Sequence, residues 1–136
     1  MSKKTPSQTA KRAAWDAFSR YIRVRDCLAT TRRPDVGRCY TCGALHEIGE
    51  LDAGHFIGGR KGENLLDERG VHAQCRKCNR FLHGNLVPYT LMMIHEYGEG
   101  IVDELTAASL TPVRRGEIEW HMIANHYKAI VKELQR

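Results

Sequence analysis

The sequence predicts an α+β fold in which a glycine-rich centre with short strands is flanked by helices on both sides. Apolar residues recur at helical spacing near both ends of the chain, whereas glycines interrupt every run in the middle. Cysteines and histidines crowd the same middle segment. The 136 residues are about enough for one domain. We therefore treat residues 1–136 as a single domain with an N-terminal basic helix (5–26), a central segment (38–85) and C-terminal helices (86–136).

The boundaries of the first helix and of the central elements follow from local signals. Ser7 is the expected N-cap of the first helix, which should run to about Asp26. In the centre we expect short strands near residues 51–56 and 70–74, because glycines leave no room for longer ones. A helix should begin at or just after Cys78.

The last third of the chain should be helical. Pro88 fits the first turn of a helix that ends at Gly98. A short helix is expected over residues 99–108. Thr111 followed by Pro112 predicts an N-cap and the first position of a last helix, which should run to about residue 134.

The composition favours a soluble protein that binds polyanions. Charged residues make up 27% and hydrophobic residues 42% of the chain, which is typical of a folded domain. No stretch approaches the roughly 20 apolar residues of a membrane span, and no signal peptide is evident at the N-terminus. We therefore expect a cytoplasmic protein with no membrane partner. The net charge of +5 supports nucleic acid as a partner, because a basic surface attracts polyanions, but a solvated basic face is the alternative and charge alone does not decide between them.

Two Cys-x2-Cys pairs, Cys39/Cys42 and Cys75/Cys78, predict a structural zinc site. Each pair can direct two thiolates at one ion, and two pairs complete a tetrahedral Zn²⁺ site. Disulfides are disfavoured in a reducing compartment, and no βαβ pattern supports a redox pair. A closed four-cysteine site stabilises the fold and leaves no open position for catalysis. The fifth cysteine, Cys27, fits a buried position after the apolar run of the first helix.

A second group of chemically active side chains lies between the cysteine pairs and directly after them. His55 lies in the first predicted strand and is a base that titrates near neutral pH. Asp52 and Asn79 carry side-chain oxygens that suit Mg²⁺ or Mn²⁺. Hydrolysis of a phosphodiester needs a base for the attacking water and a hard cation for the phosphate charge, so this group favours a nuclease. His83 is a further candidate metal ligand, with a solvated histidine as the alternative, and His72 is expected to pack against the cysteine pairs.

These motifs resemble those of a known protein family. The segments 52–56, 67–69, 71–75, 78–79 and 84–89 are similar to the phage NinG/Rap recombination nucleases, and the overall pattern resembles the zinc-bound His-Me finger (HNH) endonucleases. The resemblance implies a treble-clef-like ββα-metal core. It also implies a structure-specific endonuclease that acts on branched DNA such as Holliday junctions and D-loops. A phage-encoded protein of this kind would work in the host cytoplasm.

The resemblance also assigns roles to residues. His55 matches the general base, Asp52 and Asn79 match the ligands of a catalytic Mg²⁺ or Mn²⁺, and the four paired cysteines match the zinc ligands. Many His-Me fingers have the acidic ligand directly before the histidine, whereas here residues 52 and 55 should point to opposite faces of a regular strand. A bulge at Ala53 and Gly54 would re-aim Asp52. The asparagine that often orients the base is absent, so a backbone carbonyl or another side chain must position the imidazole.

Basic residues flank this site in the sequence and are expected to contact DNA phosphates. These residues are Arg60, Lys61, Arg69, Arg76, Lys77 and Arg80. The basic face of the first helix should extend the contact surface. Cutting both strands of a junction favours a two-fold homodimer. Candidate interface residues are Met92, Met93 and Trp120, with a place in the core as the alternative.

Two other functions compete with the endonuclease. A non-catalytic zinc-bound module that binds DNA or RNA would need the cysteines and the basic residues but not Asp52, His55 and Asn79. A zinc-stabilised protein-interaction adaptor is disfavoured by the net charge of +5 and by the lack of a large apolar stripe in the centre. The endonuclease is therefore our prediction.

Overall fold

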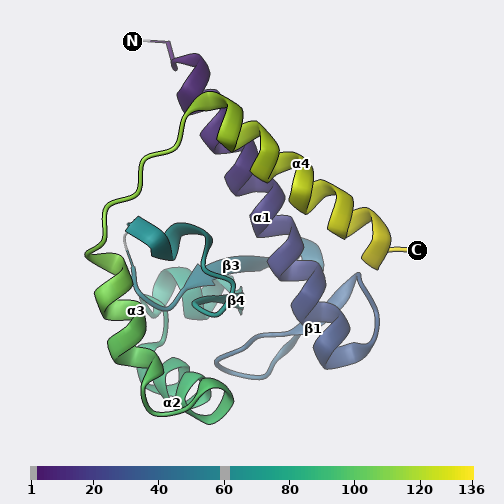
Figure 1. The fold of residues 1–136 in the computed structure, drawn as a ribbon. Coiled ribbons are helices and arrows are strands. Elements are labelled where there is room, and N and C mark those ends of the chain that lie inside the picture. Colours follow the sequence, from purple (N-terminus) through teal and green to yellow (C-terminus); the bar gives the residue numbers. More distant parts are fainter. Residues whose placement is uncertain (1–2, 59–61) are drawn as a thin grey trace.

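In the computed structural model, which describes residues 3–58 and 62–136, helices surround two small antiparallel sheets (Figure 1). The strands are β1 (Val36–Arg38) with β2 (Leu45–Glu47), and β3 (Leu51–His55) with β4 (Val71–Cys75). The α+β prediction is confirmed, and β3 and β4 lie within one residue of their expected bounds. The β1–β2 hairpin was not predicted, because strands of three residues show too little alternation to detect.

The first helix, α1 (Pro6–Thr31), is longer than the sequence predicts. Its N-cap is Thr5 rather than Ser7. The Thr5 hydroxyl accepts a hydrogen bond from the backbone N–H of Gln8 at 3.1 Å, and the Gln8 side chain accepts one from the Thr5 N–H at 2.8 Å. The helix ends where Arg32 adopts a left-handed φ of 63°.

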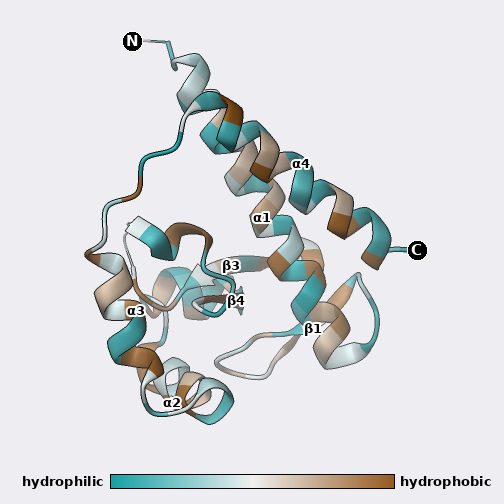
Figure 2. Cartoon of the chain, in the orientation of Figure 1, coloured by the Kyte–Doolittle hydropathy of each residue, from teal (hydrophilic) through white to brown (hydrophobic). Residues whose placement is uncertain are grey.

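The last helix, α4 (Glu117–Leu134), lies alongside α1 and runs in the same general direction (Figure 1). Hydrophobic and hydrophilic segments alternate along both helices (Figure 2). The start predicted at Thr111 and Pro112 is wrong, because α4 begins five residues after Pro112. Gly116 precedes the helix, and its N–H donates to the Glu119 side chain at 3.4 Å. This carboxylate cap, rather than the proline, fixes the first turn.

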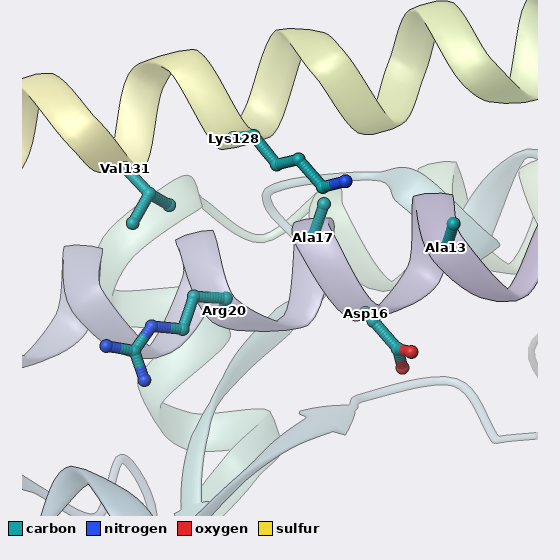
Figure 3. Close-up of a pocket in the computed structure, with 6 residues that line it drawn as sticks. All are labelled: Ala13, Asp16, Ala17, Arg20, Lys128 and Val131. Carbon is teal, nitrogen blue, oxygen red and sulfur yellow. The ribbon is translucent and has the colours of Figure 1, made fainter.

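A groove of about 420 Å³ remains between α1 and α4, and Figure 3 shows its lining. Ala13 and Ala17 face the groove from α1, while Lys128 and Val131 reach it from α4. The small alanine side chains let the two helices approach closely. The charged side chains of Asp16, Arg20 and Lys128 do not point toward one another in this view, so we assign no chemical site to the groove.

The segment after β4 forms a single π-helical turn, η3 (Lys77–Phe81), where the sequence predicted a helix beginning at or just after Cys78. The chain turns away because three successive residues, His83, Gly84 and Asn85, have positive φ values of 51°, 94° and 49°. Remaining elements are η1 (Ile48–Glu50), η2 (Gly62–Leu66), α2 (Leu86–Tyr97) and α3 (Ile101–Ser109). The predicted end of α2 at Gly98 is confirmed.

Two apolar clusters form most of the core. One lies between α1 and α4, and the other joins α2 and α3 to Phe56 just after β3. Trp120 is 6% exposed in the first cluster and Met93 is 0% exposed in the second, so the core alternative holds for these two candidate interface residues. Met92 is 39% exposed. Within the described residues, no helix is long and apolar enough to cross a membrane.

A polar network fastens α1 to β4. The Asp26 carboxylate accepts hydrogen bonds from Arg25 Nε at 2.8 Å and from the Ala73 N–H at 2.7 Å. The His72 ring is 2% exposed and its Nδ1 lies 3.6 Å from the same carboxylate. His72 also stacks on Tyr40, between the first two cysteines, at 3.7 Å between ring centroids, so its predicted packing role is confirmed. The network holds the strand that carries the second cysteine pair.

Candidate functional site

The four paired cysteines converge, as predicted. Their Sγ atoms all lie within 4.8 Å of one another, and Cys42 Sγ lies 3.8 Å from Cys75 Sγ. Tetrahedral zinc with Zn–S bonds of about 2.3 Å separates its sulfur ligands by about 3.8 Å. The donor set and spacing therefore fit a metal ion such as zinc. Cys27 stands apart from this cluster and is buried, as expected.

Backbone turns at both pairs aim the thiols inward. Cys39 follows β1, and Gly43, with a φ of 77°, closes a turn in which its N–H donates to the Cys39 carbonyl at 2.9 Å. Cys75 ends β4, and Cys78 lies in η3. Burial raises the pKa of Cys39, but hydrogen bonds from the Thr41 hydroxyl and from backbone groups outweigh it and lower this pKa to about 6. A thiolate is the form that binds metal.

A polar pocket of about 390 Å³ lies beside the cysteine cluster and brings Asp52 and Asn79 together. Asn79 Nδ2 donates to Asp52 Oδ2 at 3.0 Å. Arg80 grips both oxygens of the same carboxylate, with Nε and Nη2 each at 2.9 Å. The Asp52 side chain is 16% exposed and that of Arg80 is 57% exposed. The pocket thus gathers a carboxylate, an amide and a guanidinium from β3 and η3.

The opposite wall of this pocket comes from α1. Arg12, Asp16, Ser19 and Arg23 recur every three or four residues and therefore share one face of the helix. Arg23 Nε donates to the Ser19 carbonyl at 3.2 Å. Burial and the nearby Arg20 lower the pKa of Arg23, while Asp52 raises it. The sequence assigned DNA contacts to the basic face of this helix, but it did not single out Arg12 and Arg23. The only signal in the sequence that could have identified Arg12 and Arg23 is their helical spacing, which places them on the same face of α1.

Gly54 is required for the close packing that places Asn79. A Cβ atom at position 54 would lie 1.9 Å from Gln74 Oε1 and 2.9 Å from Asn79 Oδ1. Gln74 is fully buried, and its Nε2 donates to the Gly84 carbonyl at 2.8 Å. The buried amide thereby ties β4 to the turn after η3. Sequence reasoning did not identify Gln74, because a single polar residue in a short strand carries no spacing signal.

His55 lies at the end of β3, and its ring contacts Leu65 and Trp15. Nε2 donates to the Leu65 carbonyl at 3.1 Å, and the ring stacks on Trp15 at 5.1 Å between centroids. A carbonyl can only accept, so Nε2 carries a hydrogen in this contact. A backbone carbonyl therefore orients the imidazole, which is one of the two arrangements that the sequence left open.

Strand β3 is regular, so His55 and Asp52 point to opposite faces. The pairing runs without interruption from Leu51 opposite Cys75 to His55 opposite Val71, and the bulge at Ala53 and Gly54 is absent from this described pairing. Trp15 links the two sides, because it lines the polar pocket and also stacks on His55. The structure thus joins Asp52 to Asn79 directly and places His55 at the side of their pocket.

The remaining predicted site residues are scattered. His83 does not share a helix face with Asn79, since η3 ends at Phe81, and it is exposed. Arg69 is engaged in ion pairs with Asp67 at 3.1 Å and Glu104 at 2.8 Å. Of the other predicted DNA contacts, Arg76 and Arg80 line the polar pocket, Lys77 is exposed beside the cysteine cluster, and Arg60 and Lys61 lie outside the described residues.

Comparison with known proteins identifies the family. The family model of the bacteriophage lambda NinG protein matches residues 2–136, nearly the whole chain. The chain belongs to the NinG family. The resemblance seen in the sequence is therefore confirmed at the level of the NinG family.

Curated NinG proteins share one segment with this chain. The NinG proteins of Salmonella phage P22, Escherichia phage 933W and Escherichia phage lambda are 43%, 41% and 40% identical to it over 68 residues. That segment is 49% of this chain and 33% of each relative, so the match spans about a third of the relatives' length. No solved structure matches the chain.

Proposed function

We propose that this NinG-family protein is a divalent-metal-dependent endonuclease that hydrolyses phosphodiester bonds in DNA, with branched recombination intermediates such as Holliday junctions and D-loops as substrates. The observation that carries the proposal is the 3.0 Å contact between Asp52 and Asn79 in an arginine-lined pocket beside the cysteine cluster. Phosphodiester hydrolysis needs cation ligands, a base and cationic contacts to phosphate. Side chains of all three kinds occur in and around this pocket.

The Asp52–Asn79 pair fits a hard cation such as Mg²⁺ or Mn²⁺. Adjacent oxygens around an octahedral Mg²⁺ with bonds of about 2.1 Å lie about 3.0 Å apart. The measured separation of the two side-chain atoms is 3.0 Å, and a half-turn of the Asn79 amide would place its oxygen where the nitrogen now lies. Asp52 and Asn79 would hold the cation, which would neutralise charge on the phosphate that is attacked.

The chain's own residues supply the remaining roles. His55 would accept a proton from the attacking water as the general base, while the Leu65 carbonyl orients its ring. Arg23 and Arg76, which line the pocket, would bind the phosphates on either side of the cut. The metal-binding cysteine cluster would fix η3, and with it Asn79, relative to β4.

Arg80 would act as an exchangeable partner of Asp52. Its bidentate ion pair occupies both carboxylate oxygens, but the Arg80 guanidinium is exposed, so water screens the pair and the pair contributes little to stability. A DNA phosphate offers the guanidinium an equivalent bidentate partner. Binding of DNA would therefore draw Arg80 to the phosphate and release the Asp52 oxygens.

One observation favours a second candidate, the non-catalytic zinc-bound nucleic-acid-binding module. Asp52 and His55 point to opposite faces of β3. A binding module does not need these two side chains to meet, whereas a catalytic centre needs a substrate that reaches both of them. The two candidates make opposite predictions about cleavage.

The test is cleavage of labelled four-way junction, flap and linear duplex DNA by the zinc-loaded protein with Mg²⁺ or Mn²⁺. We expect cation-dependent cutting of the branched substrates that is lost in His55→Ala. His46→Ala is the matched control, because His46 is a partly exposed histidine whose Nδ1 lies 3.3 Å from Glu50 and which does not line the polar pocket. Tight binding of every substrate without cutting under either cation would support the binding module instead.

A further inference from the structure

Large apolar side chains gather on the outer surface of η3 and the first half of α2. Phe81 is 77% exposed and Val87 is 76% exposed, and both follow closely on the residues that build the polar pocket. We call the set the η3–α2 surface; its members are Phe81, Leu82, Leu86, Val87 and Leu91, all at least 44% exposed. Clustered exposed apolar groups mark interaction sites, because water contact with them is unfavourable.

The η3–α2 surface is carried on a rigid support. The backbone N–H of Leu82 donates to the Lys77 carbonyl, and that of Gly84 donates to the Cys78 carbonyl, each at 2.9 Å. Asn85 Nδ2 contacts Cys78 Sγ at 3.5 Å. The turn that presents Phe81 is therefore fastened directly to a residue of the cysteine cluster. Little backbone freedom would be lost when this turn binds a partner.

The charges around the surface select the kind of partner. The chain has no Asp or Glu between Glu68 and Glu96, and Arg76, Lys77 and Arg80 lie in this stretch just before Phe81. A second copy related by a two-fold axis would bring two such basic groups together, which is unfavourable. A partner with apolar faces and a negative backbone fits both features, and nucleic acid has both.

The bases must be unpaired for their faces to reach this surface. In an intact duplex the base faces are covered by stacking, whereas a branch point or a frayed strand exposes them. Aromatic side chains stack on exposed bases, and apolar side chains wedge between base steps. A surface with an exposed Phe81 next to phosphate-binding arginines therefore distinguishes branched from linear DNA.

We propose that the η3–α2 surface, led by Phe81, stacks on unpaired bases at the branch point of a DNA substrate whose phosphates lie in the polar pocket. The proposal deepens the proposed function by naming the residues that select branched DNA, and it rests on DNA being the ligand. Arg80 connects the two regions, because it contacts Asp52 in the pocket and directly precedes Phe81.

The test compares the zinc-loaded wild type, Phe81→Ala and Ile118→Ala in binding to a four-way junction that carries 2-aminopurine at the branch point, without added Mg²⁺ or Mn²⁺. Ile118 is the matched control, since it is 76% exposed on α4 and lies outside the η3–α2 surface. Because a stacked base contributes measurably to affinity, Phe81→Ala should weaken junction binding about 5- to 150-fold and abolish the change in 2-aminopurine fluorescence. Its binding to linear duplex should stay within about two-fold of the wild type.

Three outcomes would overturn the proposal. Wild-type junction affinity in Phe81→Ala would exclude the stacking role. Equal weakening on junction and duplex would show a general contribution rather than recognition of the branch point. Sedimentation that changes from dimer to monomer in Phe81→Ala would make the surface a subunit interface. Zinc content and circular dichroism of the variant confirm folding. The readout needs no cleavage, so Phe81-dependent junction binding without cutting would refute the nuclease and support this surface.

Discussion

Replacing Asp26 by alanine should destabilise the protein strongly, because Asp26 joins α1 to β4 through buried charged hydrogen bonds. Its side chain is 13% exposed and that of Arg25 is 23% exposed. Alanine would remove the acceptor of the Arg25 Nε bond at 2.8 Å and of the Ala73 N–H bond at 2.7 Å. Breaking a buried ion pair from one side costs about 3–5 kcal/mol.

The lower end of that range applies, because Arg25 keeps three other acceptors, which are His72 Nδ1 at 3.2 Å and two backbone carbonyls. Its Nη1 donates to the Glu68 carbonyl at 2.7 Å and its Nη2 donates to the Val71 carbonyl at 2.8 Å. We therefore expect a loss of about 3 kcal/mol in the free energy of unfolding. With an unfolding entropy of about 2.1 cal/mol/K per residue, a chain of 136 residues would lose about 10 °C in Tm.

The assay is thermal and urea unfolding of the zinc-loaded protein, followed by circular dichroism. Asp16→Ala is the matched control. Asp16 lies on the same helix and forms an ion pair with Arg12, but its side chain is 61% exposed. That variant should lose less than about 1 kcal/mol. If Asp26→Ala were no less stable than Asp16→Ala, the network between α1 and β4 would not hold the strand as argued.

Three further predictions concern pH, metal and packing. Burial raises the pKa of Asp26, but hydrogen bonding to His72 and the charge of Arg25 outweigh it and lower this pKa. The stability that Asp26 contributes should therefore be complete above its unfolded pKa of about 3.9 and be lost as the pH falls through the lower folded value. When unfolding is measured from pH 7 to pH 2, the free energies of unfolding of wild type and Asp26→Ala should converge in acid. Removing zinc with a strong chelator should unfold the centre, because structural zinc contributes about 10–16 kcal/mol and a domain's whole stability is about 5–15 kcal/mol, and an unchanged circular dichroism spectrum after verified zinc loss would contradict this. Gly54→Ala should destabilise the protein by about 1–3 kcal/mol in urea unfolding, since the added Cβ would lie 1.9 Å from Gln74 Oε1, whereas Gly49→Ala has open space around it and should show no overpacking penalty.

The parts of the fold that depend on local chemistry could be predicted from the sequence. The cysteine pairs predicted the four-cysteine cluster, which could hold a metal ion such as zinc, and the apolar and glycine patterns placed β3 and β4 to within one residue. The end of α2 was predicted because Gly98 stops a helix locally. The family resemblance matched Asp52 and Asn79 to the ligands of a catalytic cation, which stays a prediction, and the structure brings the two side chains together.

The parts that depend on tertiary contacts could not be predicted. Whether a helix starting near Cys78 continues depends on the left-handed residues from His83 to Asn85, and only the glycine among them carries a local signal. The wall of the polar pocket required knowing which face of α1 meets β3, so Arg23 could not be singled out. The bulge proposed at Ala53 and Gly54 is wrong, because each residue from Leu51 to His55 pairs with one residue of β4.

The most direct test of the proposed centre is the single-turnover rate of four-way-junction cleavage as a function of Mg²⁺ concentration, measured for wild type and Asn79→Ala at saturating zinc. If Asp52 and Asn79 hold the cation, the wild-type rate should rise with Mg²⁺ and saturate. Asn79→Ala should cleave about 100-fold more slowly, which corresponds to a loss of about 2.7 kcal/mol of transition-state stabilisation, or should require far more Mg²⁺. A folded, zinc-loaded Asn79→Ala protein with the wild-type rate and Mg²⁺ dependence would show that the cation is held elsewhere.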